Sequence, residues 1–327
     1  MTPNDLKPDD WRAAIQSAAH TQQGRLHRTP VQTSGLLNDM AGVELFLKCE
    51  NLQKTGSFKA RGALNAVMGL HNEQRERGVV THSSGNFGQA LAWACREAGA
   101  PAVVVMPSNA PKGKVAAVKG YGAKVVHCVP TLQARESTTQ EIIERTGATF
   151  LHPFDNPDVI FGHGTITLEL AEQAPTLDAV VVPLGGGGLI SGVALGLGAM
   201  GSTTVVVGAE PEGADDAYRS KKEGKLLPQE NPNTIADGLL TSMGRHTWPV
   251  VRDRVSQVVT VSDEEIVSAM RVVWSRMKLV IEPSSAAAVA VALKTSVWQT
   301  ANTKRVGVVV SGGNVDFPLL GAPKDAD

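Results

Sequence analysis

Short apolar runs rich in β-branched residues alternate with longer helical stretches along most of the chain, and this alternation constrains the fold most strongly. The expected strands are Val43–Cys49, Ala102–Met106, Lys124–Val129, Ala179–Val182, Thr204–Gly208, Gln257–Val261 and Val306–Val310. The expected helices are Phe87–Gly99, Pro111–Tyr121, Leu132–Thr146, Leu189–Gly198, Asp263–Lys278 and Ser284–Val297. The strand runs are almost continuously apolar, as in parallel strands that are covered on both faces. The alternation therefore predicts an α/β fold with open, mostly parallel, twisted sheets that carry helices on both faces.

Composition excludes several other classes of protein. The 327 residues include 31 Lys and Arg against 32 Asp and Glu, a net charge of −1 that argues against nucleic-acid binding and a basic membrane surface. Cys49, Cys95 and Cys128 form no CxxC pair, so we expect reduced core cysteines rather than a zinc site or disulfides. No apolar run reaches about 18 residues, and the first residues lack a signal-peptide pattern. We therefore expect a cytoplasmic protein without a membrane span.

Four consecutive glycines form the clearest ligand-binding motif. Ligands of open α/β sheets bind beyond the carboxyl ends of the strands. Gly185–Gly188 follow the predicted strand Ala179–Val182 and precede the helix expected to start at Leu189. Glycines let several backbone N–H groups point at one anion, and the helix N-terminus adds a favourable dipole. The run therefore predicts a phosphate site, and a merely flexible glycine loop is the alternative.

Three further loops carry side chains that suit the same ligand. Lys59, beside an aromatic residue at a turn into a helix, would lose water, which lowers a lysine pKa and favours a Schiff base with an aldehyde. Taken alone, a lysine in such a segment is more often a solvated surface residue. The segment Ser83–Gln89 suits a substrate carboxylate, although Ser83 or Ser84 could simply cap the next helix. Ser311 follows the last strand and can reach a ring nitrogen, so the four loops together are the parts needed to hold pyridoxal phosphate.

At these residues the chain resembles the fold-type II pyridoxal-phosphate enzymes, in the branch of the serine racemases and serine/threonine dehydratases. The matching segments are KCENLQKTGSFKARGALNAV, THSSGNFGQALAWA, PLGGGGLISGVALG, GAEPEGADDAYRSKKEGKL, IADGLL, RMKLVIEPSSAAAVA and VVSGGNVD, and they extend from about residue 25 to residue 316. The resemblance implies two sheets and a homodimer. It also implies a large cofactor-binding domain formed by residues 1–77 and 157–327, and a small mobile domain over residues 78–156.

The resemblance further implies a role for each matching residue. Lys59 is then the Schiff-base lysine that takes the α-proton on one face of the substrate, and Ser84 is the acid–base group on the opposite face. The implied cofactor contacts are Phe58, Lys59, Asn86, Gly185, Gly186, Gly187, Gly188, Leu189 and Ser311. The implied substrate contacts are Ser83, Ser84, Asn86, Phe87, Arg135, Phe154 and Ser242. A cation site matches Glu210, the carbonyl of Ala214, and Asp216, and its oxygen ligands suit Mg²⁺ or Ca²⁺, with monovalent ions in some members.

Two positions depart from the pattern of the family. Phe87 replaces a histidine in the SSGNHGQ loop, and Phe154 replaces an asparagine of the racemase pattern. Burying a phenyl group stabilises by roughly 1.5–3 kcal/mol, and aromatic pairing adds about 0.5–1.5 kcal/mol. The exchange therefore favours a substrate with a bulky apolar or aryl β-substituent. The alternative is that both rings only pack between the domains.

These inferences together predict a carbon–oxygen lyase. We expect a pyridoxal-phosphate-dependent dehydratase (ammonia-lyase) that converts a β-hydroxy-α-amino acid into a 2-oxo acid and ammonia. L-threo-3-phenylserine, which would give phenylpyruvate, is the preferred substrate. L-threonine or L-serine dehydratase activity and serine racemase activity are the alternatives among enzymes. A non-catalytic module that binds a phosphate ligand is the alternative from another class.

Overall fold

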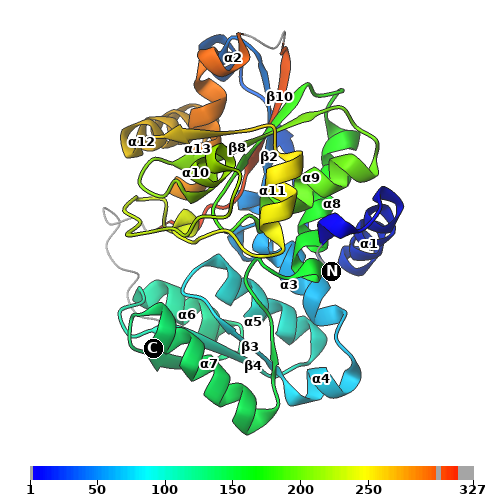
Figure 1. The fold of residues 1–327 in the computed structure, drawn as a ribbon, viewed down its shortest axis with the longest axis vertical. Coiled ribbons are helices and arrows are strands. Elements are labelled where there is room, and N and C mark those ends of the chain that lie inside the picture. Colours follow the sequence, from blue (N-terminus) through cyan, green and yellow to red (C-terminus); the bar gives the residue numbers. More distant parts are fainter. Residues whose placement is uncertain (1–2, 300–302, 316–327) are drawn as a thin grey trace.

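The computed structural model describes residues 3–299 and 303–315, which form two sheets with helices packed around them (Figure 1). The six-stranded sheet has the strand order β1-β2-β10-β7-β8-β9, and the four-stranded sheet has the order β5-β4-β3-β6. All neighbouring strands are parallel except β1, which pairs antiparallel with β2. The predicted α/β fold with mostly parallel sheets is therefore confirmed. Asp316, which ends the last matching segment, lies outside the described residues.

The bounds of the elements are as follows. The strands are β1 (Val31–Gln32), β2 (Glu44–Cys49), β3 (Val79–His82), β4 (Ala102–Pro107), β5 (Lys124–Cys128), β6 (Thr149–Phe150), β7 (Ala179–Pro183), β8 (Val205–Pro211), β9 (Gln257–Val261) and β10 (Arg305–Val310). The α-helices are α1 (Pro8–Gln22), α2 (Gly35–Ala41), α3 (Lys59–Met68), α4 (Asn72–Arg77), α5 (Asn86–Ala98), α6 (Lys112–Gly120), α7 (Leu132–Thr146), α8 (Pro157–Gln173), α9 (Gly188–Ala199), α10 (Asp216–Glu223), α11 (Thr247–Arg254), α12 (Asp263–Val272), α13 (Pro283–Leu293) and α14 (Thr295–Trp298). The strands of the four-stranded sheet all lie between residues 79 and 150, and the proposed domain bounds stay a prediction.

Both faces of the six-stranded sheet are covered by helices (Figure 1). Val180 of β7 belongs to a core that also contains Trp11 of α1 and Ile190 of α9. Val181, the next residue of the same strand, belongs to the opposite core with Ala287 of α13. Because successive side chains of a strand point to opposite faces, a strand buried on both sides must be apolar throughout. This is why the strands are visible in the sequence as continuous apolar runs.

The seven predicted strands are confirmed to within a few residues, whereas three short strands were missed. β1 and β6 are each two residues long, too short to form a recognisable apolar run. β3 begins with two valines but ends in Thr81 and His82, so its pattern is interrupted by polar residues. The missed β3 matters because its carboxyl end leads into the loop that carries Ser83 and Ser84.

Two predicted helices are not continuous α-helices in the structure. The predicted helix Asp263–Lys278 ends as α12 at Val272 and is followed by a π turn over Val273–Met277. Lys278 then adopts a left-handed backbone with φ +58°, which ends any right-handed helix. The predicted helix Ser284–Val297 is divided into α13 and α14. Neither correction moves a residue of the site described below.

The remaining exclusions can be compared with the structure directly. Cys49, Cys95 and Cys128 are all buried and none forms a disulfide, as predicted. Burial raises the pKa of the Cys49 and Cys95 thiols to about 12, so both are packing residues rather than nucleophiles. Over residues 3–299 and 303–315, none of the helices combines the length and the apolar character needed to cross a bilayer.

Candidate active site

Lys59 is the first residue of α3, and its amine lies among aromatic rings. The Nζ atom is 5.0, 5.7 and 6.0 Å from the ring centroids of Phe58, Phe87 and Phe154, respectively. The amine donates a hydrogen bond of 2.9 Å to the Pro153 carbonyl. Burial lowers the pKa of Lys59 to about 8, against the opposing effect of a nearby carboxylate. A larger fraction of this amine than of an ordinary lysine is therefore neutral near pH 7, and the neutral form is the one that attacks a carbonyl group.

The glycine run connects β7 to α9, and the ring of Phe154 lies between this run and the amine of Lys59. A side chain is sterically excluded at Gly186, because a Cβ atom there would lie 2.5 Å from the ring of Phe154. Gly187 has a left-handed backbone with φ +83°. The backbone N–H groups of residues 185–189 donate to no residue that the structure describes. Such a row of unpaired donors at the start of a 12-residue helix is suited to a phosphate group.

Asn86, at the start of α5, is held by two residues from other parts of the chain. Its Nδ2 atom donates to both oxygens of Glu282, at 2.8 and 3.1 Å. The Asn314 Nδ2 atom donates to the side-chain oxygen Oδ1 of Asn86 at 2.9 Å. Glu282 is buried at the N-cap of α13, and burial raises its pKa to about 7. These contacts connect the loop after β3, in the four-stranded sheet, to the last loop of the six-stranded sheet.

The loop after β10 packs directly against the residues that precede the lysine. Phe58 N–H donates to the Ser311 carbonyl at 3.0 Å, and Ser57 forms an isolated antiparallel bridge with Gly312. The Ser57 hydroxyl is buried without a hydrogen-bond partner among the described residues. The Ser311 hydroxyl is also buried, 3.1 Å from the hydroxyl of Ser285. The structure therefore gathers the predicted glycine run, lysine, asparagine and serine around one place.

The glycine run, Lys59, Asn86 and Ser311 lie in a chain that matches one protein family over nearly all of its length. A sequence profile for the family described as "Pyridoxal-phosphate dependent enzyme" matches residues 23–312. The chain belongs to this family of pyridoxal-phosphate-dependent enzymes. Pyridoxal phosphate carries both a phosphate and an aldehyde. Membership of this family therefore explains why unpaired N–H groups and a desolvated lysine occur in one site.

Relatives that are named for an activity are similar to this chain over more than nine-tenths of its length. "Serine racemase" of Dictyostelium discoideum is 50% identical over 94% of this chain and 95% of that protein. "beta-hydroxyaspartate dehydratase" of Paracoccus denitrificans is 47% identical over 93% of this chain and 96% of that protein. The solved structure of maize serine racemase superposes with a TM-score of 0.92 at 44% identity, covering 94% of both chains. The relatives thus include both racemases and a dehydratase.

The residues of the site fit the cofactor of the family. The free N–H groups of residues 185–189 can hold its phosphate, and the neutral amine of Lys59 can condense with its aldehyde. The unpartnered hydroxyl of Ser57 and the hydroxyl of Ser311 are polar groups that a bound ligand could satisfy. Leu189 is buried at the start of α9.

The loop between β3 and α5 carries both predicted serines, immediately before Gly85 and Asn86. Neither serine caps α5, since Gly85 is the N-cap residue; this alternative interpretation is wrong. Gly85 N–H instead donates to the Ser83 hydroxyl at 3.3 Å. Ser84 is half-buried, and its hydroxyl forms no hydrogen bond to a described residue. Burial lowers the pKa of His82, and the positive charge of the nearby Arg135 of α7 lowers it further.

The two phenylalanines that depart from the family pattern lie near the lysine in different surroundings. Phe87 is only 2% exposed and belongs to the core around α3 and α5. Phe154 is half-buried and lies on the glycine run, with its ring 4.5 Å from that of His152. Burial lowers the pKa of His152 to about 4, so this ring is neutral at physiological pH. Packing therefore explains part of the role of Phe87, but both rings also face the amine of Lys59.

The predicted cation ligands form a separate buried cluster at α10. Both oxygens of Glu210 accept backbone hydrogen bonds, from the N–H groups of residues 217 and 218. Asp216 accepts a hydrogen bond from the backbone at residue 243 through one oxygen, while its other oxygen is buried without a partner in the described chain. Burial raises the pKa of Glu210 to about 9 and that of Asp216 to about 6. Ser242 lies beside this cluster, where its hydroxyl accepts a hydrogen bond from Gln229 N–H at 2.9 Å.

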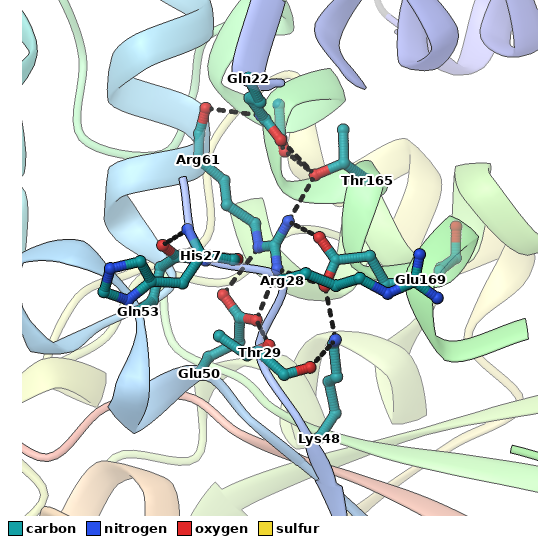
Figure 2. Close-up of polar contacts among 12 residues, drawn as sticks. Gln22, His27, Arg28, Thr29, Lys48, Glu50, Gln53, Arg61, Thr165 and Glu169 are labelled. Carbon is teal, nitrogen blue, oxygen red and sulfur yellow. Dashed lines mark hydrogen bonds and ion pairs between the residues drawn. The ribbon is translucent and has the colours of Figure 1, made fainter. Parts of the chain in front are cut away.

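A buried network of charges holds α3 in place behind the lysine (Figure 2). Arg61, two residues after Lys59, forms ion pairs of 2.7 Å with Glu50 and with Glu169 of α8. Lys48 of β2 forms a second ion pair of 2.6 Å with Glu169. Figure 2 shows the guanidinium between the two carboxylates, with each of its nitrogens engaged. The network joins the lysine-bearing helix to both β2 and α8.

Sequence reasoning missed several residues of the site. Glu282 and Asn314 lie in matching segments but received no role, although a glutamate next to Pro283 within an apolar stretch indicates a helix start with a buried acid. Ser285 stands in the same segment, and its position offers no signal of its own. Pro153 contributes through its carbonyl, which any residue could supply. Such backbone contacts leave no trace in residue identity.

Proposed function

We propose that the chain is a hydroxy-amino-acid ammonia-lyase, which converts a β-hydroxy-α-amino acid into a 2-oxo acid and ammonia. The observation that carries the proposal is the Lys59 amine, buried among three phenyl rings beside the free N–H groups of residues 185–189. Pyridoxal phosphate, when bound, supplies an aldehyde and an electron-withdrawing ring that acidifies the Cα–H bond of an amino acid. The 47% identity to a relative named for dehydration of β-hydroxyaspartate supports loss of a β-hydroxyl.

Lys59, Asn86 and Ser311 each have a separate role in the proposed reaction. Lys59, with a pKa near 8, is suited to take the α-proton as a neutral amine and to return as an ammonium donor. Asn86, oriented by its bonds to Glu282 and Asn314, is suited to the phenolic oxygen of the cofactor. Ser311 would offer a neutral hydroxyl to the ring nitrogen of the bound cofactor. A neutral partner would leave that nitrogen uncharged, which would favour prompt loss of the β-hydroxyl.

The rings around the lysine support a substrate with an apolar β-substituent. Phe58, Phe87 and Phe154 surround the amine that meets the substrate, and a phenyl group buried there would gain about 1.5–3 kcal/mol. Serine has no carbon beyond the β-hydroxymethyl group and gains little from such a wall. We therefore propose L-threo-3-phenylserine as the preferred substrate, with L-threonine next.

A substrate panel tests the proposal. We expect kcat/KM for 2-oxo acid release to be higher with L-threo-3-phenylserine than with L-threonine, L-serine or 3-hydroxyaspartate. Phe154→Asn should lower the ratio of phenylserine to serine on the order of ten- to a hundredfold, because the apolar contact is replaced by an amide. The control is Phe46→Leu, which changes a phenylalanine of β2 and should leave the ratio unchanged. A kcat/KM for serine well above that for phenylserine would remove the aryl preference.

Serine racemase activity is the second candidate, and one observation favours it. The Ser84 hydroxyl lies half-buried in the loop before α5 and bonds to no described residue, so it is available to protonate the second face of Cα. A 50% identical relative is named serine racemase. The same panel in D₂O separates the two activities, since racemisation yields D-serine with deuterium at Cα while elimination yields a 2-oxo acid. Ser84→Ala should abolish the D-serine and retain the elimination that starts from Lys59.

We also propose that Glu210, Asp216 and the carbonyl of Ala214 hold a divalent cation. A buried carboxylate oxygen of Asp216 without a partner, beside a second buried carboxylate, is unfavourable unless a positive charge is near. After treatment with a chelator, addition of Mg²⁺ or Ca²⁺ should raise the thermal unfolding midpoint of the protein. The rise should be lost in Asp216→Asn, and an equal rise in that variant would rule out these ligands.

A further inference from the structure

Two serine hydroxyls lie next to each other beneath the last loop of the six-stranded sheet. Ser311 follows β10, Ser285 lies in the first turn of α13, and their Oγ atoms are 3.1 Å apart. The two residues are 3% and 0% exposed, so water cannot replace a missing partner of either hydroxyl. Ser311 has a place in the proposed function, whereas Ser285 has none so far.

The hydrogen bonds around Ser285 leave a choice for one proton. The Ser285 oxygen accepts a hydrogen bond of 2.7 Å from Gly312 N–H, so its own O–H remains to be donated. Two acceptors are within reach, the Gly312 carbonyl at 2.9 Å and the Ser311 oxygen at 3.1 Å. The Gly312 carbonyl already accepts a hydrogen bond of 3.0 Å from Glu282 N–H. Donation from Ser285 to Ser311 therefore leaves no buried carbonyl unsatisfied.

The direction of this donation decides what Ser311 can do. If Ser311 donates to Ser285, its proton is used within the protein. If Ser285 donates to Ser311, the Ser311 proton is left for a ligand, and the bonds run from Gly312 N–H through Ser285 to Ser311. A hydroxyl that accepts a hydrogen bond becomes a stronger donor, because consecutive hydrogen bonds polarise one another.

We propose that Ser285 is a positioning residue, which donates to Ser311 and thereby directs the Ser311 proton to the ring nitrogen of the bound cofactor. The proposal deepens the proposed function and rests on the assignment of Ser311 to that nitrogen. With Ser285 donating to it, Ser311 is a stronger hydrogen-bond donor than a single serine would be. No acidic side chain is then needed beside the ring nitrogen. The two coupled hydroxyls would thus strengthen the hydrogen bond to the ring nitrogen while leaving that nitrogen uncharged.

The test compares two variants of equal shape at one position. Ser285→Thr keeps the hydroxyl, and Ser285→Val replaces it with a methyl group of nearly the same size. The cofactor is removed, and the dissociation constant for added pyridoxal 5′-phosphate is measured by fluorescence titration, together with the absorption spectrum of the bound cofactor across pH. We expect Ser285→Val to bind the cofactor about three- to tenfold more weakly than Ser285→Thr. We also expect its bound-cofactor absorption bands to differ in ratio from those of Ser285→Thr.

A double-mutant cycle separates this role from a structural one. In a Ser311→Ala background, Ser285→Val and Ser285→Thr should bind the cofactor equally, because Ser285 acts through Ser311. A purely structural role would lower the thermal stability of the cofactor-free Val variant but leave its spectrum and its relative affinity unchanged, and that result would overturn the proposal. Absence of ammonia-lyase activity together with the expected spectra would refute the proposed function and leave this inference standing.

Discussion

Replacing Lys59 with alanine is expected to lower kcat on the order of 10⁴-fold or more, because the variant loses the amine that we propose both anchors the cofactor and takes the α-proton. The amine is buried among three phenyl rings, and its hydrogen bond runs to the Pro153 carbonyl. Borohydride reduction of the wild-type protein should attach the cofactor covalently to the peptide that contains Lys59. Mass spectrometry of the reduced, digested protein should find no such adduct in the variant.

Two further variants make this result specific. Lys119→Ala removes an exposed lysine of α6 and should retain both the adduct and the turnover. Lys59→Arg keeps a positive charge but cannot deprotonate, so it should be as inactive as the alanine variant. A full cofactor adduct on another lysine of Lys59→Ala, with turnover preserved, would show that a different amine carries the reaction.

Arg61→Met is expected to lower the free energy of unfolding by about 3–5 kcal/mol, because it leaves two carboxylates without their main partner. Glu50 is fully buried, and Glu169 keeps only its ion pair with Lys48. A urea titration followed by tryptophan fluorescence measures the change through the midpoint and slope. The loss should also displace the start of α3, so the remaining folded protein should bind the cofactor more weakly.

An exposed ion pair provides the matched control for this effect. Arg252 pairs with Asp253 on the surface of α11, with a distance of 2.6 Å that resembles those of the buried network. Because both partners stay in water, Arg252→Ala should cost no more than about 1 kcal/mol. Similar losses for the two arginines would mean that the buried network contributes little beyond a surface pair.

The parts of the fold and of the candidate site that could be predicted from the sequence are those encoded locally. The continuous apolar character of β7 follows from burial on both faces, and the glycine run after it follows from the need for free N–H groups. The parts that were missed depend on contacts between distant segments. Asn86 and Glu282 are 196 residues apart in the sequence, and neither residue type indicates the other. Lys278 ends a helix through backbone conformation, which its own identity does not favour.

The position of Phe154 has a consequence for how this enzyme could change its substrate during evolution. Its ring both covers Gly186 of the glycine run and faces the amine of Lys59. Under the proposed function, a single replacement at this position would alter cofactor retention and substrate choice together, so a gain in one property would come with a loss in the other. At Phe87, inside the small core around α5, the same function would couple substrate choice to stability. New specificities should consequently arise through paired substitutions, with the second restoring what the first has lost.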